Sequence, residues 1–139
     1  MKDIRWLLCA ALLLLAGAAR AASVLFIATG NVPQGKFHQL AEIARPHGIS
    51  IEVRYLHSLP ADVDAGLWRG HDAVFFDSYL QDEVLGRLAR ALPALKAPNA
   101  WLYDQKPAWG GGLPETVARR LITYYASGGR QNYEGFFAT

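Results

Sequence analysis

Cysteine is nearly missing from this chain of 139 residues, in which Cys9 is the only one. Cys9 lies in an apolar run near the amino terminus that we expect to be removed as a leader, so the mature chain contains no cysteine. This excludes disulfide bonds and thiolate metal sites from the mature chain. A cysteine nucleophile is excluded as well, and the G-x-S-x-G pattern of a serine nucleophile does not occur. We therefore expect no catalytic residue.

The chain also has no large net charge, positive or negative. The formal net charge is +2 at pH 7. Loss of the leader, with Lys2, Arg5, Arg20 and Asp3, would bring it to zero. Acidic residues alternate with arginines along the rest of the chain, so they form no basic stripe. The sequence therefore predicts no nucleic-acid partner.

The amino terminus has the pattern of a secretory signal peptide over residues 1–21. A short basic segment over residues 1–5 precedes an apolar run over residues 6–17, and Ala19-Arg20-Ala21 is a small-x-small cleavage site. An uncleaved membrane anchor is the alternative, but a spanning helix needs about 20 apolar residues and Arg20 interrupts the run too early. We expect cleavage near Ala21-Ala22, export to a periplasm, and membrane contact only through the leader before cleavage.

Residues 22–127 alternate the patterns of buried strands and amphipathic helices. Strands are expected over 23–29, 49–55, 73–77 and 100–103, and helices over 37–44, 80–92 and 114–125. The apolar positions of the second helix, which is expected to end at Pro93, are Leu80, Val84, Leu85, Leu88 and Leu92. This alternation is typical of a parallel sheet with right-handed crossovers. The sequence predicts an α/β fold, a flavodoxin-like three-layer sandwich with a mainly parallel sheet, incomplete at its carboxyl end.

Two segments are expected to lie outside these elements. Residues 109–112, Trp-Gly-Gly-Gly, are expected to form a surface connector, with a lid over a flat ligand as the alternative. Residues 128–139 are expected to start a following helix that is truncated after about two turns. Phe136 and Phe137 would then lack packing partners, which predicts poor solubility.

Polar residues follow three of the expected strands. In parallel sheets, ligands bind where loops leave the carboxyl ends of the strands. The ligand-binding candidates at these positions are Thr29, Gly30, Asn31, Asp77, Ser78, Tyr79 and Asp104. The alternative is that they cap helices and satisfy turns, as Asn, Asp and Ser commonly do. We expect them to converge on one edge of the sheet.

Residues 30–36, Gly-Asn-Val-Pro-Gln-Gly-Lys, fit the G-x-x-x-x-G-K spacing of a phosphate-binding loop. Asp77, at the end of an apolar strand, matches the magnesium-binding aspartate of such enzymes. However, Phe37 stands where a hydroxyl should hold magnesium, and Pro33 removes one N–H from the cradle. An exported protein would also meet little ATP. The loop is expected to shape a turn.

The histidines do not predict a metal site. His38 and Glu42 share one face of a helix at i,i+4, a spacing that can hold a metal but more often forms a solvated pair. A second converging pair of ligands is needed for a site. We expect this chain to hold no metal.

The segment Tyr124-Tyr125-Ala126-Ser127-Gly128-Gly129-Arg130-Gln131-Asn132 resembles Y-Y-x-x-G-G-x-x-N in the amino-terminal part of the large cobaltochelatase subunit. The large subunit of magnesium chelatase, a relative, has the same type of segment. The order of elements is also similar, with one strand ending in Phe76-Asp77, another carrying Trp101-Leu102-Tyr103, and a helix running into the double glycine. The motif residues are Tyr124, Tyr125, Gly128, Gly129 and Asn132.

The resemblance implies a role in the metal chemistry of tetrapyrroles. In that family the large subunit binds the tetrapyrrole with cobalt or magnesium, and separate subunits use ATP to drive insertion. This chain would be the amino-terminal portion of such a nitrogen–metal ligase, working with the remainder of the large subunit or a chelatase-like complex. Most of the chemistry is expected outside this portion, which implies no cofactor bound by this chain and no activity alone.

The leader departs from the family, because cobalamin-pathway enzymes are cytoplasmic. Exported relatives are associated with uptake of metals or tetrapyrroles, which implies a periplasmic role in handling haem, cobalamin or a metal. The alternative is a stand-alone periplasmic binding or interaction domain that takes part in that uptake.

Overall fold

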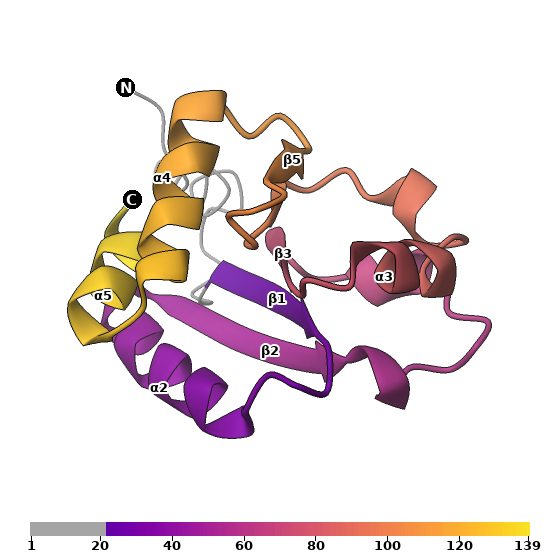
Figure 1. Ribbon diagram of the computed structural model, residues 1–139, viewed down its shortest axis with the longest axis horizontal. Helices are drawn as coiled ribbons and strands as arrows, with labels where there is room; N and C mark the ends of the chain where they lie inside the picture. The colour runs from indigo at the N-terminus through magenta and orange to yellow at the C-terminus, as the bar shows by residue number, and fades with distance from the viewer. Residues whose placement is uncertain (1–21) are drawn as a thin grey trace, which may run out of the picture.

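A five-stranded sheet forms the middle layer of the computed structural model, which describes residues 22–139 (Figure 1). The strands are β1 (Ala22–Ala28), β2 (Ile49–Tyr55), β3 (Ala73–Asp77), β4 (Asn99–Trp101) and β5 (Ala108–Gly110). Their order is β2-β1-β3-β4-β5; the first four are parallel, and β5 runs antiparallel to β4. The expected leader, residues 1–21, lies outside the described residues, whereas Ala22, on the far side of the expected cleavage site, begins β1.

Helices cover both faces of the sheet, so the predicted α/β flavodoxin-like sandwich is confirmed. The α-helices are α2 (Gln34–Ala44), α3 (Gln81–Arg87), α4 (Glu115–Ser127) and α5 (Arg130–Ala138). The short 3₁₀ turns are η1 (Arg45–His47), η2 (Leu56–Ser58), η3 (Ala65–Trp68) and η4 (Leu92–Ala94). Figure 1 shows α2, α4 and α5 grouped on one side of the sheet, with α3 on the other. Across residues 22–139, no helix is both long and apolar enough to span a membrane.

Two hydrophobic cores lie on opposite faces of the sheet, because successive side chains of a strand point in opposite directions. The α4-side core includes Val24, Phe26, Phe37, Leu40, Phe75, Leu121, Tyr125, Tyr133, Phe136 and Phe137. The α3-side core includes Leu25, Ile27, Leu56, Trp68, Val74, Phe76, Val84, Leu88 and Trp101. The strands β1 and β3 therefore bury both of their faces, as their continuous apolar sequences predict.

The carboxyl-terminal helix belongs to the α4-side core. Phe136 and Phe137 are 1% and 2% exposed, so the expectation that they lack packing partners is wrong. Gly128 and Gly129 take φ of 68° and 85°, values that glycine adopts readily and that other residues avoid. The chain therefore turns sharply after α4, and α5 packs against both α4 and α2.

Two local expectations are also wrong. Helix α3 ends at Arg87 rather than at Pro93, and Leu85 is 45% exposed instead of buried. Val84 and Leu88 fill the core one turn apart, and Leu88 already has non-helical φ and ψ of −103° and 18°. Trp109 lies within β5 rather than in a loop, because it pairs with Ala100 of β4.

Candidate functional site

The carboxyl ends of β1 and β3 and the segment after β4 meet at one edge of the sheet. The candidates that line a hollow of about 220 Å³ there are Asn31, Asp77, Ser78, Tyr79 and Asp104. Thr29 and Gly30 line a neighbouring cleft of about 520 Å³, which Asn31 and Tyr79 also border. The expected convergence of the seven residues is confirmed, and their role in binding a ligand remains a prediction.

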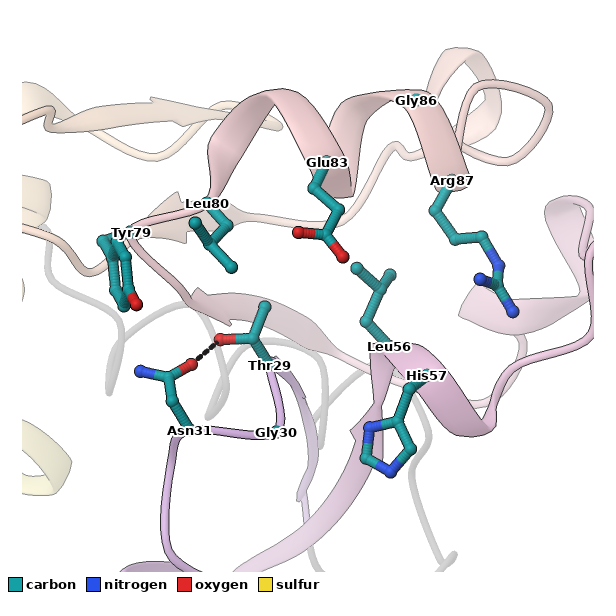
Figure 2. Close-up of a pocket in the computed structure, with 10 residues that line it drawn as sticks. All are labelled: Thr29, Gly30, Asn31, Leu56, His57, Tyr79, Leu80, Glu83, Gly86 and Arg87. Carbon is teal, nitrogen blue, oxygen red and sulfur yellow. Dashed lines mark hydrogen bonds between the residues drawn. The ribbon is translucent and has the colours of Figure 1, made fainter.

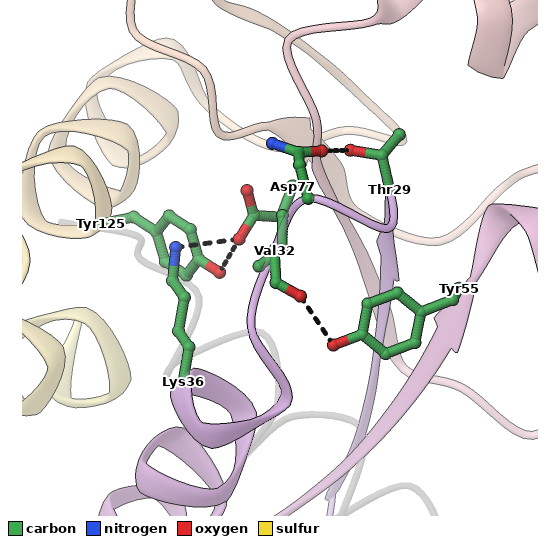
Figure 3. Close-up of polar contacts among 7 residues, drawn as sticks. Thr29, Val32, Lys36, Tyr55, Asp77 and Tyr125 are labelled. Carbon is green, nitrogen blue, oxygen red and sulfur yellow. Dashed lines mark hydrogen bonds and ion pairs between the residues drawn. The ribbon is translucent and has the colours of Figure 1, made fainter.

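Asp77 is the centre of a polar network at this edge (Figure 3). The Lys36 Nζ atom lies 2.9 Å from Asp77 Oδ2, and the Tyr125 hydroxyl donates a hydrogen bond of 2.5 Å to the same oxygen. Lys36 also lies 4.1 Å from the centre of the Tyr125 ring, within the range of a cation–π contact. The Asp77 side chain is only 16% exposed, and these two partners offset the cost of desolvating its charge.

Three separate elements bring these groups together. Asp77 is the last residue of β3, so its carboxylate emerges where the apolar strand ends. Lys36 lies in the first turn of α2, and Tyr125 lies on the buried face of α4 near its end. The network therefore ties two helices of one layer to the central strand of the sheet.

The charge of Asp77 acts on three tyrosines, of which Tyr125 contacts it directly. Burial raises the pKa of the Tyr125 hydroxyl well above its ordinary value, and the negative charge of Asp77 raises it further. The pKa values of Tyr55 and Tyr133 are also raised, first by burial and then by Asp77. The Tyr55 hydroxyl donates to the Val32 carbonyl at 3.0 Å (Figure 3). All three hydroxyls therefore keep their protons to higher pH than an ordinary tyrosine does.

We expect the Tyr125→Phe variant to lose less stability than the wild type in alkaline solution. A tyrosine of the unfolded chain ionises near pH 10, whereas folded Tyr125 keeps its proton to higher pH. Its stabilising contribution is thus complete below pH 10 and is lost as the pH rises through the folded pKa. Urea unfolding at a series of pH values measures this decline. The variant should reduce the decline without abolishing it, because Tyr55 and Tyr133 also contribute.

The control for this measurement is Tyr79→Phe, because Tyr79 is 53% exposed and lies away from the buried face of α4. The control should follow the wild-type decline. If Tyr125→Phe loses stability above pH 10 as steeply as the wild type, ionisation of Tyr125 does not contribute to the alkaline loss of stability.

The segment that resembles a phosphate-binding loop forms a turn, as expected. The Val32 N–H donates to the Thr29 carbonyl at 3.0 Å, and the Thr29 hydroxyl donates to the Asn31 side chain. Neither Gly30 nor Gly35 takes a positive φ.

The larger cleft lies between the β1–α2 loop, η2 and α3 (Figure 2). Its apolar lining includes Leu56 and Leu80. The polar side chains on its border are Thr29, Asn31, His57, Tyr79, Glu83 and Arg87. Figure 2 shows Arg87 and His57 towards one end of the cleft, Asn31 and Tyr79 towards the other, and Glu83 pointing in between them. The cleft therefore offers an apolar surface with groups of both charges at its border.

Arg87 joins α3 to the turn after β2. Its Nη2 atom donates to the Leu59 carbonyl at 2.5 Å. Its Nε atom is buried, and within residues 22–139 it has no hydrogen-bond partner. Buried donors are almost always paired in folded proteins, so Nε is an unused donor in the wall of the cleft.

Several groups of this edge are not among the candidates that the sequence predicts. Lys36 fits only the phosphate-loop pattern, and Tyr125 only the double-tyrosine motif. His57, Glu83 and Arg87 belong to neither pattern. His57 could have been found by applying the strand-end rule to β2, and Glu83 and Arg87 by their i,i+4 spacing on the helix that follows Asp77.

No group of three or more His, Cys, Asp or Glu within residues 22–139 is arranged to hold a metal ion. His47 instead pairs with Glu134 on α5 at 3.0 Å. His71 lies 3.8 Å from Glu52 and 3.0 Å from the Ser23 hydroxyl.

Each residue of the Tyr124–Asn132 motif has a place in the corner between α4 and α5. The half-buried Tyr124 ring lies so close to Gly135 that a Cβ there would be 2.5 Å from it. Tyr125 reaches Asp77, as described above. Gly128 and Gly129 have positive φ, and the Asn132 side chain donates to the Gly128 carbonyl at 2.7 Å. The motif thus connects the carboxyl-terminal corner to the strand-end site.

What is established for this chain is its α/β flavodoxin-like fold and the geometry of its strand-end edge. Comparison of the chain with protein-family models, with curated proteins and with solved structures finds no match in any of the three.

Proposed function

We propose that this chain is the amino-terminal part of an exported large subunit of the cobaltochelatase and magnesium chelatase type. It acts in the insertion or removal of the metal of a tetrapyrrole related to cobalamin or haem, and it is inactive alone. The observation that carries the proposal is the Tyr124–Asn132 segment, which matches Y-Y-x-x-G-G-x-x-N at every specified position. The metal is substrate in this scheme, and separate subunits use the ATP.

The contribution of this domain is to bind part of the tetrapyrrole at the strand-end cleft. A volume of about 520 Å³ falls in the range of small-molecule sites. A tetrapyrrole has an apolar ring with carboxylate or amide substituents. Leu56 and Leu80 suit the ring, while Arg87 and Asn31 suit the substituents. The proximity of the motif residue Tyr125 to this edge supports the same assignment.

The alternative is a stand-alone periplasmic domain that binds or passes on a ligand during metal or tetrapyrrole uptake. The burial of Phe136 and Phe137 favours this alternative, because both side chains find packing partners in the α4-side core of the described residues. The DNA downstream of Thr139 separates the two proposals. A continuation in frame, or after one frameshift, supports the chelatase subunit, whereas a stop codon followed by an unrelated gene supports the stand-alone domain.

Titration of residues 22–139 with haem and with cobalamin tests ligand binding. We expect a shift of the Soret or corrin bands at ligand concentrations on the order of tens of micromolar, equivalent to a binding free energy of about −6 kcal/mol. Gly86→Trp should abolish the shift, because Gly86 lines the cleft and an added Cβ meets no described atom within 4 Å. Gly35→Trp is the matched control on α2, where the space is equally open. Unchanged spectra, or a shift that survives Gly86→Trp, would count against the cleft.

A further inference from the structure

The outer edge of β2 offers a pairing surface. Within residues 22–139, β2 pairs with β1 on one side only, and it stands at the end of the sheet. It is seven residues long, Ile-Ser-Ile-Glu-Val-Arg-Tyr, with neither proline nor lysine. Edge strands are usually protected by proline, charged side chains, bulges or short length, and of these β2 has only the charges of Glu52 and Arg54. The opposite edge strand, β5, has only three residues.

An apolar groove of about 360 Å³ runs beside this edge, between α2 and β2. Phe37 and Ala41 of α2 line one side, and Ile51, Val53 and Tyr55 of β2 line the other. These three β2 residues pack against the α4-side core but stay only half-buried. The groove would be covered by apolar side chains of a strand added next to β2.

The charges on the other face of β2 have a self-complementary order. Glu52 and Arg54 flank Val53 and are 51% and 41% exposed. They form an ion pair of 3.9 Å with each other, and Glu52 also lies 3.8 Å from His71. The exposed part of each side chain can still meet an opposite charge on a neighbouring strand. An antiparallel copy of β2 centred on Val53 would place its Arg54 opposite Glu52, and its Glu52 opposite Arg54.

We propose that β2 pairs antiparallel with β2 of a second copy of this chain, about a two-fold axis at Val53. Opposite charges directly across an antiparallel pair are favourable, and like charges are unfavourable. A register centred on residue 52 would oppose two glutamates, and one centred on residue 54 would oppose two arginines. Only the register centred on Val53 places unlike charges opposite each other on both sides of the axis. In this register Ile51 also lies opposite Tyr55 of the other copy.

Such a dimer is closed, because the same patch serves both copies. It joins two five-stranded sheets into one. The inference is independent of the proposed function, so failure of haem or cobalamin binding would leave it unaffected.

Analytical ultracentrifugation of residues 22–139 over a range of micromolar concentrations tests the pairing. We expect a monomer–dimer equilibrium. Glu52→Arg alone, or Arg54→Glu alone, should raise the dissociation constant by about tenfold or more, because each change converts two attractive pairs into repulsive ones. The double variant Glu52→Arg/Arg54→Glu restores unlike pairs and should restore the wild-type dissociation constant.

Glu115→Arg is the matched control, because Glu115 is an exposed partner of Arg119 on α4, away from β2. The control should associate like the wild type, and circular dichroism should show all variants folded. A monomer at every concentration overturns the proposal. A dimer that is insensitive to the single changes, or that the double variant fails to restore, also overturns it, because association would then use another surface.

Discussion

Phe136→Ala should lower the free energy of unfolding of residues 22–139 by about 3–5 kcal/mol, the usual cost of truncating a buried phenylalanine. Phe136 is 1% exposed, and its ring centre lies 5.2 Å from that of Phe75 and 5.6 Å from that of Tyr125. Its removal leaves a cavity between α5 and the sheet that rigid neighbours cannot fill. Urea unfolding monitored by circular dichroism measures the loss.

Leu85→Ala is the control for this large effect. Leu85 is 45% exposed on α3, so its truncation should change stability by less than about 0.5 kcal/mol. A nearly neutral Phe136→Ala would mean that α5 does not pack on the sheet. It would also restore the sequence-based expectation that the two phenylalanines are exposed.

Gly111→Ala should destabilise the protein more than the same change at the next residue. Both Gly111 and Gly112 take positive φ, 66° and 81°, so alanine costs about 1–2 kcal/mol at either position through backbone conformation alone. A Cβ on Gly111 would lie 1.9 Å from the Ala97 carbonyl oxygen, whereas one on Gly112 meets no described atom within 4 Å. The backbone must shift to relieve that contact, which adds about 1–3 kcal/mol.

Gly112→Ala is the control for Gly111→Ala. Both variants place alanine at a positive φ, but only the methyl group at residue 111 meets nearby atoms. If Gly111→Ala and Gly112→Ala lower the free energy of unfolding equally, the turn that follows β5 does not approach residues 97–98 closely. Amide exchange should localise the damage of Gly111→Ala to β4 and β5, because Gly110 pairs with Asn99 immediately before the turn.

Elements whose own sequence determines their burial could be predicted. The strands β1 and β3 are apolar throughout and are central in the sheet. The apolar residues at helical spacing in α4 are all buried, because a single stripe faces one core; they are Val117, Ala118, Leu121, Ile122 and Tyr125. The convergence of Thr29, Asp77 and Asp104 followed from the strand-end rule, which needs only the strand order to be parallel.

Features that depend on distant partners could not be predicted. Lys36 and Tyr125 bind the same Asp77 oxygen across sequence separations of 41 and 48 residues, and no local pattern indicates such a pairing. The burial of Phe136 depends on the angle that Gly128 and Gly129 give the chain. β5 is three residues long and contains a glycine, so it exists because β4 offers it backbone partners rather than through its own propensity.

The two cores differ in their chromophores. Trp68 and Trp101 both lie in the α3-side core, whereas Tyr125 and Tyr133 lie in the α4-side core with most of the phenylalanines. Trp109 packs against the α4-side core, so a Trp109→Phe variant of residues 22–139 is needed for tryptophan fluorescence to report on the α3 side of the sheet alone. Tyrosine absorbance then has two buried reporters on the other side. Unfolding curves from the two signals coincide if both layers separate from the sheet in one cooperative step. The distribution of aromatic residues thus makes each half of the sandwich separately observable without an added label.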